Sequence, residues 1–409
     1  MGVTPFPFFL QKGGDSYLNT TESELLKILS SSLFQTDYQI NEEIDYNRVL
    51  KEARAQSVLG LVYPIVKDAE NLRDEWKEEF FVTVMQNAAV EAGHAEIHRL
   101  FKEEKIPYVT LKGCASAKYY PEPSLRTMGD VDFLVAESDF ERAERILLEN
   151  GFEHAHEDSS ERHRSFNKNN LLWELHKRIS GIPAGDVGEL CKRKISGMIG
   201  KAALISTDGG EFYIPDSYHH GMVILLHTVG HITSTGVGLR HVCDWAVFVN
   251  SMPEDVFVDM FSKDLKEIGL WKFTKLLTAF CSEYLGMPEK SFAADADKNI
   301  LPSMMEDILS GGNFGKKDKD RYHGSMMMSS NTNQSVTKSL FQTLNNRARK
   351  RMPVVNKVPV LLPIGWAYVG VNHFVMIAKG ERPKVKLKRT LKKTVSRREL
   401  IEEYKIFSE

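Results

Sequence analysis

Residues 111–135, LKGCASAKYYPEPSLRTMGDVDFLV, carry the pattern that decides the fold. The segment YVTL at residues 108–111, which leads into this stretch, predicts a short buried strand that ends in a Lys112-Gly113 turn and enters a helix. VDFLV predicts a second strand after a loop of turn residues. Further strands are expected at FEHAHE, HRSFNK and LLWELHKRI, and a hairpin is expected at the DGG turn between ALIST and EFYIP. Strands and helices thus alternate over about residues 106–215, which indicates a mixed α/β core.

Helical patterns flank this core on both sides. Apolar residues recur at helical spacing over about residues 22–101, and within the core a helix is expected from an N-cap at Ser138 to a stop at Gly151. The predicted fold class is therefore α+β, an α/β core with a mixed sheet between N- and C-terminal helical regions. Amphipathic helices are expected after the core at 217–232, 238–250, 254–268 and 270–286. The predicted domains are an N-terminal helical region at 1–94, the α/β core at 95–215, a C-terminal helical domain at 216–345, and a proline-interrupted apolar segment with a basic tail at 346–409.

The overall composition is that of a globular chain without a strong net charge. Hydrophobic residues make up 42% and charged residues 26%, which excludes a disordered or fibrous chain. The 53 basic and 55 acidic residues leave a net charge of -2, so a nucleic-acid partner is not expected. The four cysteines are far apart and support neither a disulfide framework nor a thiolate zinc site. The sequence shows no signal-peptide pattern and no uninterrupted apolar stretch of about 20 residues, so we expect a cytoplasmic protein without a transmembrane segment.

Two carboxylates lie on one face of the predicted second strand. Because side chains alternate along a strand, Asp130 and Asp132 point the same way while Val131 and Phe133 point to the opposite face. A divalent cation would offset the repulsion between the two carboxylates, and hard oxygen ligands suit Mg²⁺ or Mn²⁺. A solvated strand end without a metal is the alternative interpretation of an Asp-x-Asp pattern.

The surroundings of this pair favour a phosphate-binding site. The glycine turn at Gly113 lets backbone amides approach a phosphate at the start of a helix. Lys112 and Arg126 supply cations on either side of the following loop. On the later strand LLWELHKRI, Glu174 and His176 share one face, which offers a third carboxylate with a polar neighbour.

The order of these motifs resembles the DNA polymerase beta-like nucleotidyltransferase superfamily. More narrowly, LKGCASAKYYPEPSLRTMGDVDFLV, LLWELHKRI, GVGLRHVCDWA and NKVPVLLPIGWAYV are similar to a family of bacterial, mostly uncharacterised nucleotidyltransferases, over roughly residues 30–375. The resemblance implies a nucleotide-transfer fold that uses Mg²⁺ or Mn²⁺. It implies an NTP as donor, with ATP the first candidate, and leaves the acceptor open among small molecules, peptides and proteins.

The resemblance also assigns roles to individual residues. It matches Asp130 and Asp132 to the metal-binding pair, and Glu174 to the carboxylate that helps bind the metal or draws a proton from the attacking hydroxyl. The wider superfamily usually has a second glycine or a serine at the turn, whereas Cys114 stands there in this chain. The residues that we therefore expect to bind the nucleotide are Lys112, Gly113, Ser116, Arg126 and His176.

A histidine-rich segment, HTVGHITSTGVGLRHVCDWA, allows two further interpretations. His227 and His231 share a helix face, and Asp244 could complete a metal site of a hydrolase, but Thr228 stands where such an enzyme needs a glutamate base. Packing of the histidines between helices is the favoured alternative. His231, Arg240 and Asp244 are also candidates to line the cleft, and the spacing of Arg240 and Asp244 predicts an ion pair between them.

Two expectations lie outside the catalytic interpretation. A catalytically silent nucleotide-binding or scaffold protein with the same fold is the main alternative to a transferase. The basic cluster at 379–398 is expected to be solvated, with an anionic partner or an acidic membrane surface as the alternative.

Overall fold

The fold is built around a five-stranded mixed sheet, seen in a computed structural model that describes residues 18–159, 162–318, 321, 344–349, 351–352, 354–378 and 387–408. The strands lie in the order β1-β2-β5-β4-β3, in which only the β2–β5 pair is parallel. Their bounds are β1 (Tyr108–Thr110), β2 (Asp130–Val135), β3 (Glu153–Ser159), β4 (His163–Lys168) and β5 (Leu171–His176). The α+β class and the mixed sheet predicted from the sequence are thus confirmed.

Two helices cover one face of this sheet, where every second side chain of the strands is apolar. Val131, Phe133 and Trp173 point into an apolar cluster formed with α4 (Glu75–Glu103) and α6 (Phe140–Glu149). Helix α4 approaches closely at Gly93, where an added Cβ would lie 2.8 Å from Cγ2 of Val131. The acidic residues of β2 are therefore left on the opposite face of the sheet.

The predicted helix after β2 begins one residue later than expected. The N-cap of α6 is Asp139, and Ser138 lies in the turn before it, so the predicted cap at Ser138 is wrong. At the other end, Gly151 follows the helix with a φ of +80°, a conformation that favours glycine, and this part of the prediction is confirmed.

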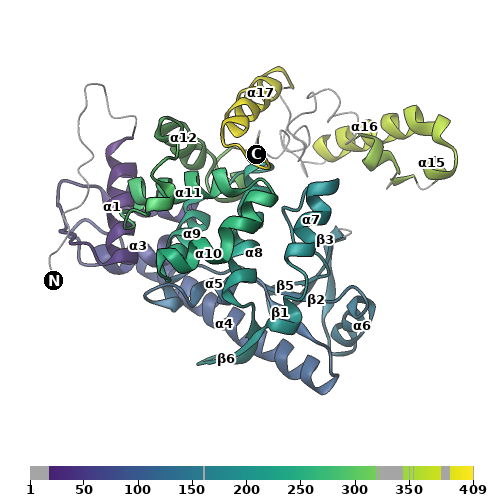
Figure 1. Ribbon diagram of the computed structural model, residues 1–409, viewed down its shortest axis with the longest axis horizontal. Coiled ribbons are helices and arrows are strands. Elements are labelled where there is room, and N and C mark those ends of the chain that lie inside the picture. Colours follow the sequence, from purple (N-terminus) through teal and green to yellow (C-terminus); the bar gives the residue numbers. More distant parts are fainter. Residues whose placement is uncertain are drawn as a thin grey trace.

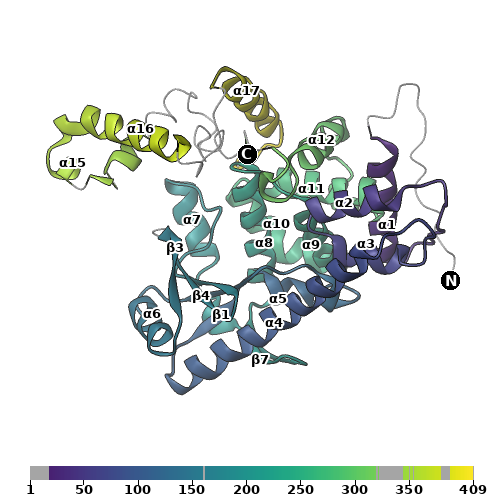
Figure 2. The ribbon, with the colours of Figure 1, turned by 180° about the vertical axis from the view of Figure 1, so that it is seen from behind.

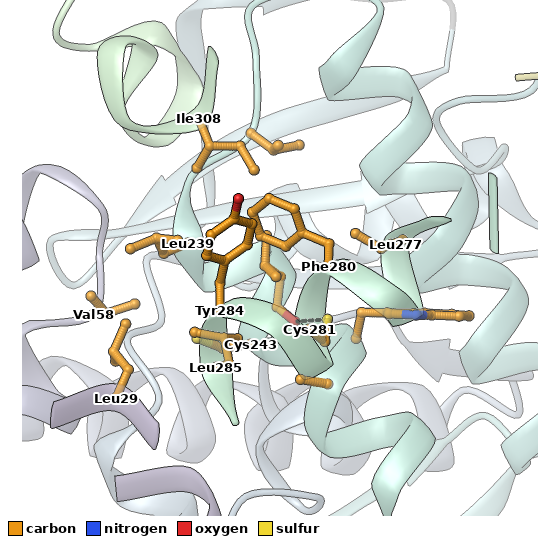
Figure 3. Close-up of a cluster of buried hydrophobic side chains, with 14 of the residues drawn as sticks. Leu29, Val58, Leu239, Cys243, Leu277, Phe280, Cys281, Tyr284, Leu285 and Ile308 are labelled. Carbon is orange, nitrogen blue, oxygen red and sulfur yellow. Dashed lines mark hydrogen bonds between the residues drawn. The ribbon is translucent and has the colours of Figure 1, made fainter. Parts of the chain in front are cut away.

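N- and C-terminal helices pack together around a single hydrophobic core. In Figure 3, Leu29 and Val58 from the N-terminal part meet Leu239, Phe280 and Ile308 from the C-terminal part. The N-terminal helices are α1 (Thr20–Phe34), α2 (Tyr46–Ala55) and α3 (Leu59–Val66). The C-terminal helices are α8 (Ser217–Ile232), α9 (Leu239–Asn250), α10 (Glu254–Glu267), α11 (Trp271–Leu285) and α12 (Leu301–Gly311), which confirms the helices expected there.

Helix α4 links this helical core to the sheet. Figures 1 and 2 show it running beneath the helices and on under the strands. Its first turn buries Trp76 in the helical core, and its last turns bury Ile97 and Phe101 against the sheet. The helix therefore continues through residue 95, where a boundary between two domains was predicted.

Shorter elements complete the described chain. They are α5 (Gly113–Ala117), α7 (Asp186–Lys194), the hairpin β6 (Ala203–Thr207) and β7 (Gly210–Ile214), α15 (Val354–Lys357), α16 (Leu362–Ala378) and α17 (Leu387–Glu403). Short 3-10 helices lie at Pro123–Leu125, Ile199–Lys201, Ser291–Ala293, Lys298–Ile300, Asn313–Gly315 and Pro359–Leu361. Among the helices of the described ranges, none combines the length and apolar character needed to cross a membrane.

The basic cluster predicted at 379–398 is only partly described. Residues 379–386 lie outside the described residues, and the remainder falls in α17. Near its end, Arg397 is buried and donates hydrogen bonds to the carbonyl oxygens of Ile232 and Ser234, and it pairs with Asp307. This arginine therefore holds α17 against the helical core.

Candidate active site

Every candidate residue named from the sequence lines one pocket, where the sheet meets α8 and α9. The pocket has a volume of about 360 Å³. The β1–α5 turn, β2, β5, α8 and α9 all contribute to its wall. The residues concerned are Lys112, Gly113, Ser116, Arg126, Asp130, Asp132, Glu174, His176, His227, His231, Arg240 and Asp244.

Three carboxylates converge in this pocket because β2 and β5 run side by side in parallel. The register pairs Asp132 directly with Glu174, and Asp130 lies two residues earlier on the same face. One oxygen from each of the three carboxylates lies within 4.8 Å of the other two. A convergent set of hard oxygen donors fits a divalent ion such as Mg²⁺ or Mn²⁺.

Two basic side chains contact the buried carboxylate of Asp132. The Nζ of Lys112 lies 2.7 Å from Asp132, whose side chain is only 3% exposed. The Nε2 of His176 donates to Asp132 at 2.8 Å and lies 3.1 Å from Glu174. Lys112 thus places a positive charge among the carboxylates, and His176 adds another when its ring is protonated.

The two aspartates of β2 differ in how easily they ionise. Burial and the neighbouring charge of Asp132 raise the pKa of Asp130 to about 6. Burial also opposes ionisation of Asp132, but Lys112 and the hydrogen bond from His176 outweigh it and lower the pKa of that carboxyl. Asp130 therefore carries the less compensated charge and has the most to gain from a cation.

The turn between β1 and α5 has a special backbone conformation. Gly113 has a φ of +34° and Lys112 a φ of +46°, both in the region that side chains disfavour. No atom would lie closer than 3.9 Å to a Cβ at Gly113, so glycine is required there for its conformation and not for space. Holding a lysine in such a conformation costs about 1–3 kcal/mol. The ion pair of Lys112 with Asp132 helps to offset this cost.

Asp244 pairs with a different arginine from the one predicted. The Nε and Nη2 of Arg126 donate to its two oxygens, each at 2.7 Å, and the hydroxyl of Tyr120 donates to the same carboxylate at 2.7 Å. The predicted ion pair between Arg240 and Asp244 is therefore wrong. The i,i+4 spacing permitted that pair, but Arg126 reaches Asp244 from the loop before β2 and fills both oxygens.

Arg240 is left without a carboxylate partner in the part of the chain that the structure describes. Its Nη1 donates to the carbonyl oxygen of Thr127 at 3.1 Å, and its guanidinium lies 5.4 Å from the ring centre of Phe314. Burial and the charge of Arg126 lower its pKa. A buried arginine that lines the pocket without a counter-ion is suited to bind an anionic group there.

Ser116 and two histidines lie at the back of the pocket. The Oγ of Ser116 is 3.5 Å from Nε2 of His220, and both side chains are buried. His94 lies behind the glycine turn, with its Nδ1 3.2 Å from the hydroxyl of Thr110. Sequence reasoning did not single out these histidines, since their helical positions carry no signal beyond burial.

Acidification should destabilise the fold through these buried imidazoles. Burial lowers the pKa of His94 to about 4 and that of His220 to about 3, from 6.5. The folded chain then binds fewer protons than the unfolded chain within this window. Stability is therefore complete above pH 6.5 and is lost as the pH falls toward these lower values. Each imidazole should contribute about 1.4 kcal/mol per pH unit inside the window, measured by urea denaturation at several pH values.

Variants separate the titrating group from its surroundings. His220→Gln should flatten the dependence of unfolding free energy on pH by that amount, whereas Ser116→Ala should keep the slope. An equal slope in the His220→Gln chain would show that this histidine does not couple protons to folding.

Two more histidines join the site only through the fold. The His163 ring centre lies 5.1 Å from that of His176, because β4 pairs these residues in register. His241 of α9 comes within ligand distance of His227 and His231 of α8. Asp244, which the less favoured metal-site interpretation offered as the third ligand of His227 and His231, is instead bound by Arg126. Strand alternation could have suggested His163, but no spacing in the sequence indicates His241.

A family of known sequences matches the part of the chain that forms most of this pocket. Residues 42–286 match the model of a family described as uncharacterised nucleotidyltransferase. This stretch makes up more than half of the chain and contains all the candidate residues named above. No curated protein and no solved structure matches the chain.

Proposed function

The chain belongs to the family of uncharacterised nucleotidyltransferases, and from this premise we propose that it is a metal-dependent enzyme that moves a nucleoside monophosphate from an NTP to a hydroxyl group. ATP is the first candidate donor, pyrophosphate is the leaving product, and the acceptor is a small molecule, a peptide or a protein. The observation that carries the proposal is the convergence of Asp130, Asp132 and Glu174 on two parallel strands of one pocket.

The three carboxylates would hold Mg²⁺ or Mn²⁺. The ion would neutralise phosphate charge and polarise the α-phosphate, which is how such ions promote in-line displacement at phosphorus. Glu174 lies beside His176 and is more accessible than Asp132, with 18% of its side chain exposed against 3%. We assign to it the contact with the acceptor hydroxyl, whose proton it is placed to accept.

Cations of the chain itself would position the triphosphate. Lys112 lies at the strained turn, and Arg240 lines the same pocket without a carboxylate of its own in the described chain. We propose that both bind phosphate oxygens, and that the Gly113 turn brings the backbone close to the phosphates. Ser116 is buried against His220 and would support this turn from behind. Arg126 is assigned a structural part, since Asp244 occupies its guanidinium.

A larger groove beside the pocket offers a route for the acceptor. It has a volume of about 1460 Å³ and shares Arg162 and Arg178 with the pocket. Apolar side chains such as Ile179 and Met198 line it together with several lysines and arginines, and Glu137 is the acidic residue in its lining. This mixture favours an acceptor that combines an apolar part with negative charge.

One observation favours the catalytically silent alternative. Lys112 and His176 already compensate the carboxylates, so the fold does not need a metal to keep this charge cluster stable. A protein that only binds a nucleotide could keep the same arrangement. Metal-dependent nucleotide binding separates the two functions.

Thermal unfolding in the presence of nucleotides tests the proposal. ATP, GTP, CTP and UTP are each added with and without Mg²⁺ or Mn²⁺ to the natural chain and to Asp130→Asn. A nucleotide at 100 times its dissociation constant should stabilise the folded state by about 2.7 kcal/mol. We expect such a shift for at least one nucleotide, only with metal, and not in Asp130→Asn.

Two other outcomes point elsewhere. A shift that is independent of metal and retained in Asp130→Asn supports a silent nucleotide-binding protein. The absence of any shift with all four nucleotides contradicts the proposed donor site.

A further inference from the structure

Three histidines meet on the helical wall of the pocket. His227 and His231 lie one turn apart on α8, and His241 reaches them from α9. Their ring centres are separated by 4.3 Å for His227 and His231 and by 5.2 Å for His231 and His241. One nitrogen from each ring lies within 4.8 Å of the other two. This convergence is independent of the carboxylates, which come from the strands.

Ring nitrogens of this cluster lack protein partners. His241 is only 3% exposed, yet neither of its ring nitrogens has a hydrogen-bond partner within the described structure. The Nδ1 of His231 is also buried without a hydrogen-bond partner in the described structure. A buried polar atom without a partner costs about 1–3 kcal/mol, so such atoms in a native fold point to a bound water, ion or ligand. Packing between helices does not account for polar atoms left unpaired in this way.

The surroundings orient and shield these rings. The Nδ1 of His227 lies 3.0 Å from the hydroxyl of Ser180, which leaves Nε2 for the cluster. A contact of this kind fixes the ring of a metal-binding histidine. The Phe314 ring packs over His231 and His241, with ring centres 4.7 and 5.4 Å away. Its backbone has a φ of +57°, a strained conformation that holds the aromatic ring against the cluster.

We propose that His227, His231 and His241 bind a divalent ion of the zinc class and leave its fourth coordination position open to the pocket. Imidazole nitrogens suit Zn²⁺, Co²⁺ or Ni²⁺, whereas carboxylates suit Mg²⁺ or Mn²⁺, so the two clusters select different ions. Three protein ligands with one open position are typical of reactive zinc sites, in contrast to closed structural sites.

The geometry requires only small movements of the rings. Zinc–nitrogen bonds of about 2.0–2.1 Å in a tetrahedron place the nitrogens about 3.4 Å apart. The present distances between the ring nitrogens are all within 4.8 Å, and rotation of the side chains would shorten them to this value. Lys112 and Arg240 oppose a cation here, while Asp130 and Asp132 in the same pocket favour it. The open position would face the space proposed for nucleotide and acceptor, where it can take a water or a substrate oxygen.

Metal binding to the full chain tests the site without any nucleotide. The protein is stripped of metal with a chelator and titrated with Zn²⁺, and bound metal is counted by elemental analysis after gel filtration. We expect one tightly bound equivalent. Co²⁺ in place of Zn²⁺ should give the intense visible absorption of a four-coordinate site with nitrogen ligands. A chain that retains no Zn²⁺ and gives no such Co²⁺ spectrum would overturn the proposal.

Variants assign the ion to the histidines. His241→Gln should weaken Zn²⁺ binding by more than about 100-fold, and Ser180→Ala by about 10–100-fold through the loss of ring orientation. His220→Gln is the matched control, because it changes a buried histidine of α8, the helix of His227 and His231, outside the cluster and should retain Zn²⁺.

A carboxylate variant separates this site from the proposed catalytic one. Asp130→Asn should retain Zn²⁺ while losing metal-dependent nucleotide binding. Loss of Zn²⁺ in Asp130→Asn with retention in His241→Gln would assign the ion to the carboxylates and contradict the proposal. Since the unmodified chain provides the Co²⁺ spectrum, the proposal stays testable even if His241→Gln fails to fold.

Discussion

Asp130→Asn should abolish nucleotide transfer and leave the chain at least as stable as before. The Asp130 side chain makes no hydrogen bond or ion pair in the described structure, and its pKa is raised to about 6 by burial and by the charge of Asp132. Asparagine therefore removes an unfavourable charge from the fold together with a proposed metal ligand. A metal contributes several kcal/mol of transition-state stabilisation, so the rate should fall by about 10³-fold or more. Pyrophosphate release from ATP measures the rate, and urea denaturation measures the stability.

Asp132→Asn provides the contrast to this variant. It should abolish transfer as well, but it should also lower the free energy of unfolding, because Lys112 and His176 lose the carboxylate that they share. The two neighbouring aspartates thus give the same kinetic result with opposite effects on stability. Full activity in both variants would exclude the carboxylate pair as the metal site.

Asp244→Asn should be among the most destabilising single changes in the chain. The Arg126 and Asp244 side chains are 4% and 8% exposed, and they join the loop before β2 to α9 by two hydrogen bonds of 2.7 Å. Asparagine can still accept from Tyr120, but it leaves the buried guanidinium without a counter-ion. Breaking a buried pair from one side costs about 3–5 kcal/mol. The midpoint and slope of urea denaturation measure the loss.

A double variant and a surface control define the origin of this effect. Arg126→Met combined with Asp244→Asn should recover most of the stability, because no unpaired charge remains in the interior. Glu289→Gln breaks the exposed pair with Lys298 and should cause almost no change. If the recovered double variant still binds nucleotide, Arg126 is structural. If the folded double variant has lost nucleotide binding, the nucleotide-binding role predicted for Arg126 from the sequence is supported.

Local sequence patterns predicted the elements of the site well. Alternation along a strand placed Asp130 with Asp132 and Glu174 with His176, and both pairs do share a face. Helical periodicity located α8 at Ser217–Ile232 as expected, with α9 to α11 within a residue or two of their predicted bounds. These features depend on residues within a few positions of one another, so the sequence contains the information directly. A helix cap depends on a single residue and is a weaker signal than periodicity, and the N-cap predicted at Ser138 was misplaced by one residue.

Partners between distant elements could not be predicted in the same way. The i,i+4 rule proposed Arg240 for Asp244, but the fold brings in Arg126 from 118 residues away. The same rule placed His227 and His231 on one helix face, but their third neighbour is His241, which the packing of α9 on α8 supplies, and not Asp244, which the sequence had suggested as a possible ligand. A helical spacing states which residues can meet on one helix and says nothing about the neighbour that the next element presents.

By itself, the sequence determined the α+β class, the strand faces that carry the carboxylates, and the resemblance that the family match confirms. Only the tertiary structure decided which of those side chains become neighbours. The parallel pairing of β2 with β5 sets Asp132 beside Glu174, and the shared helical core sets α9 against the loop before β2. The physical reason is that periodicity depends on residues close together in the sequence, whereas sheet order and helix packing depend on apolar burial summed over the whole chain.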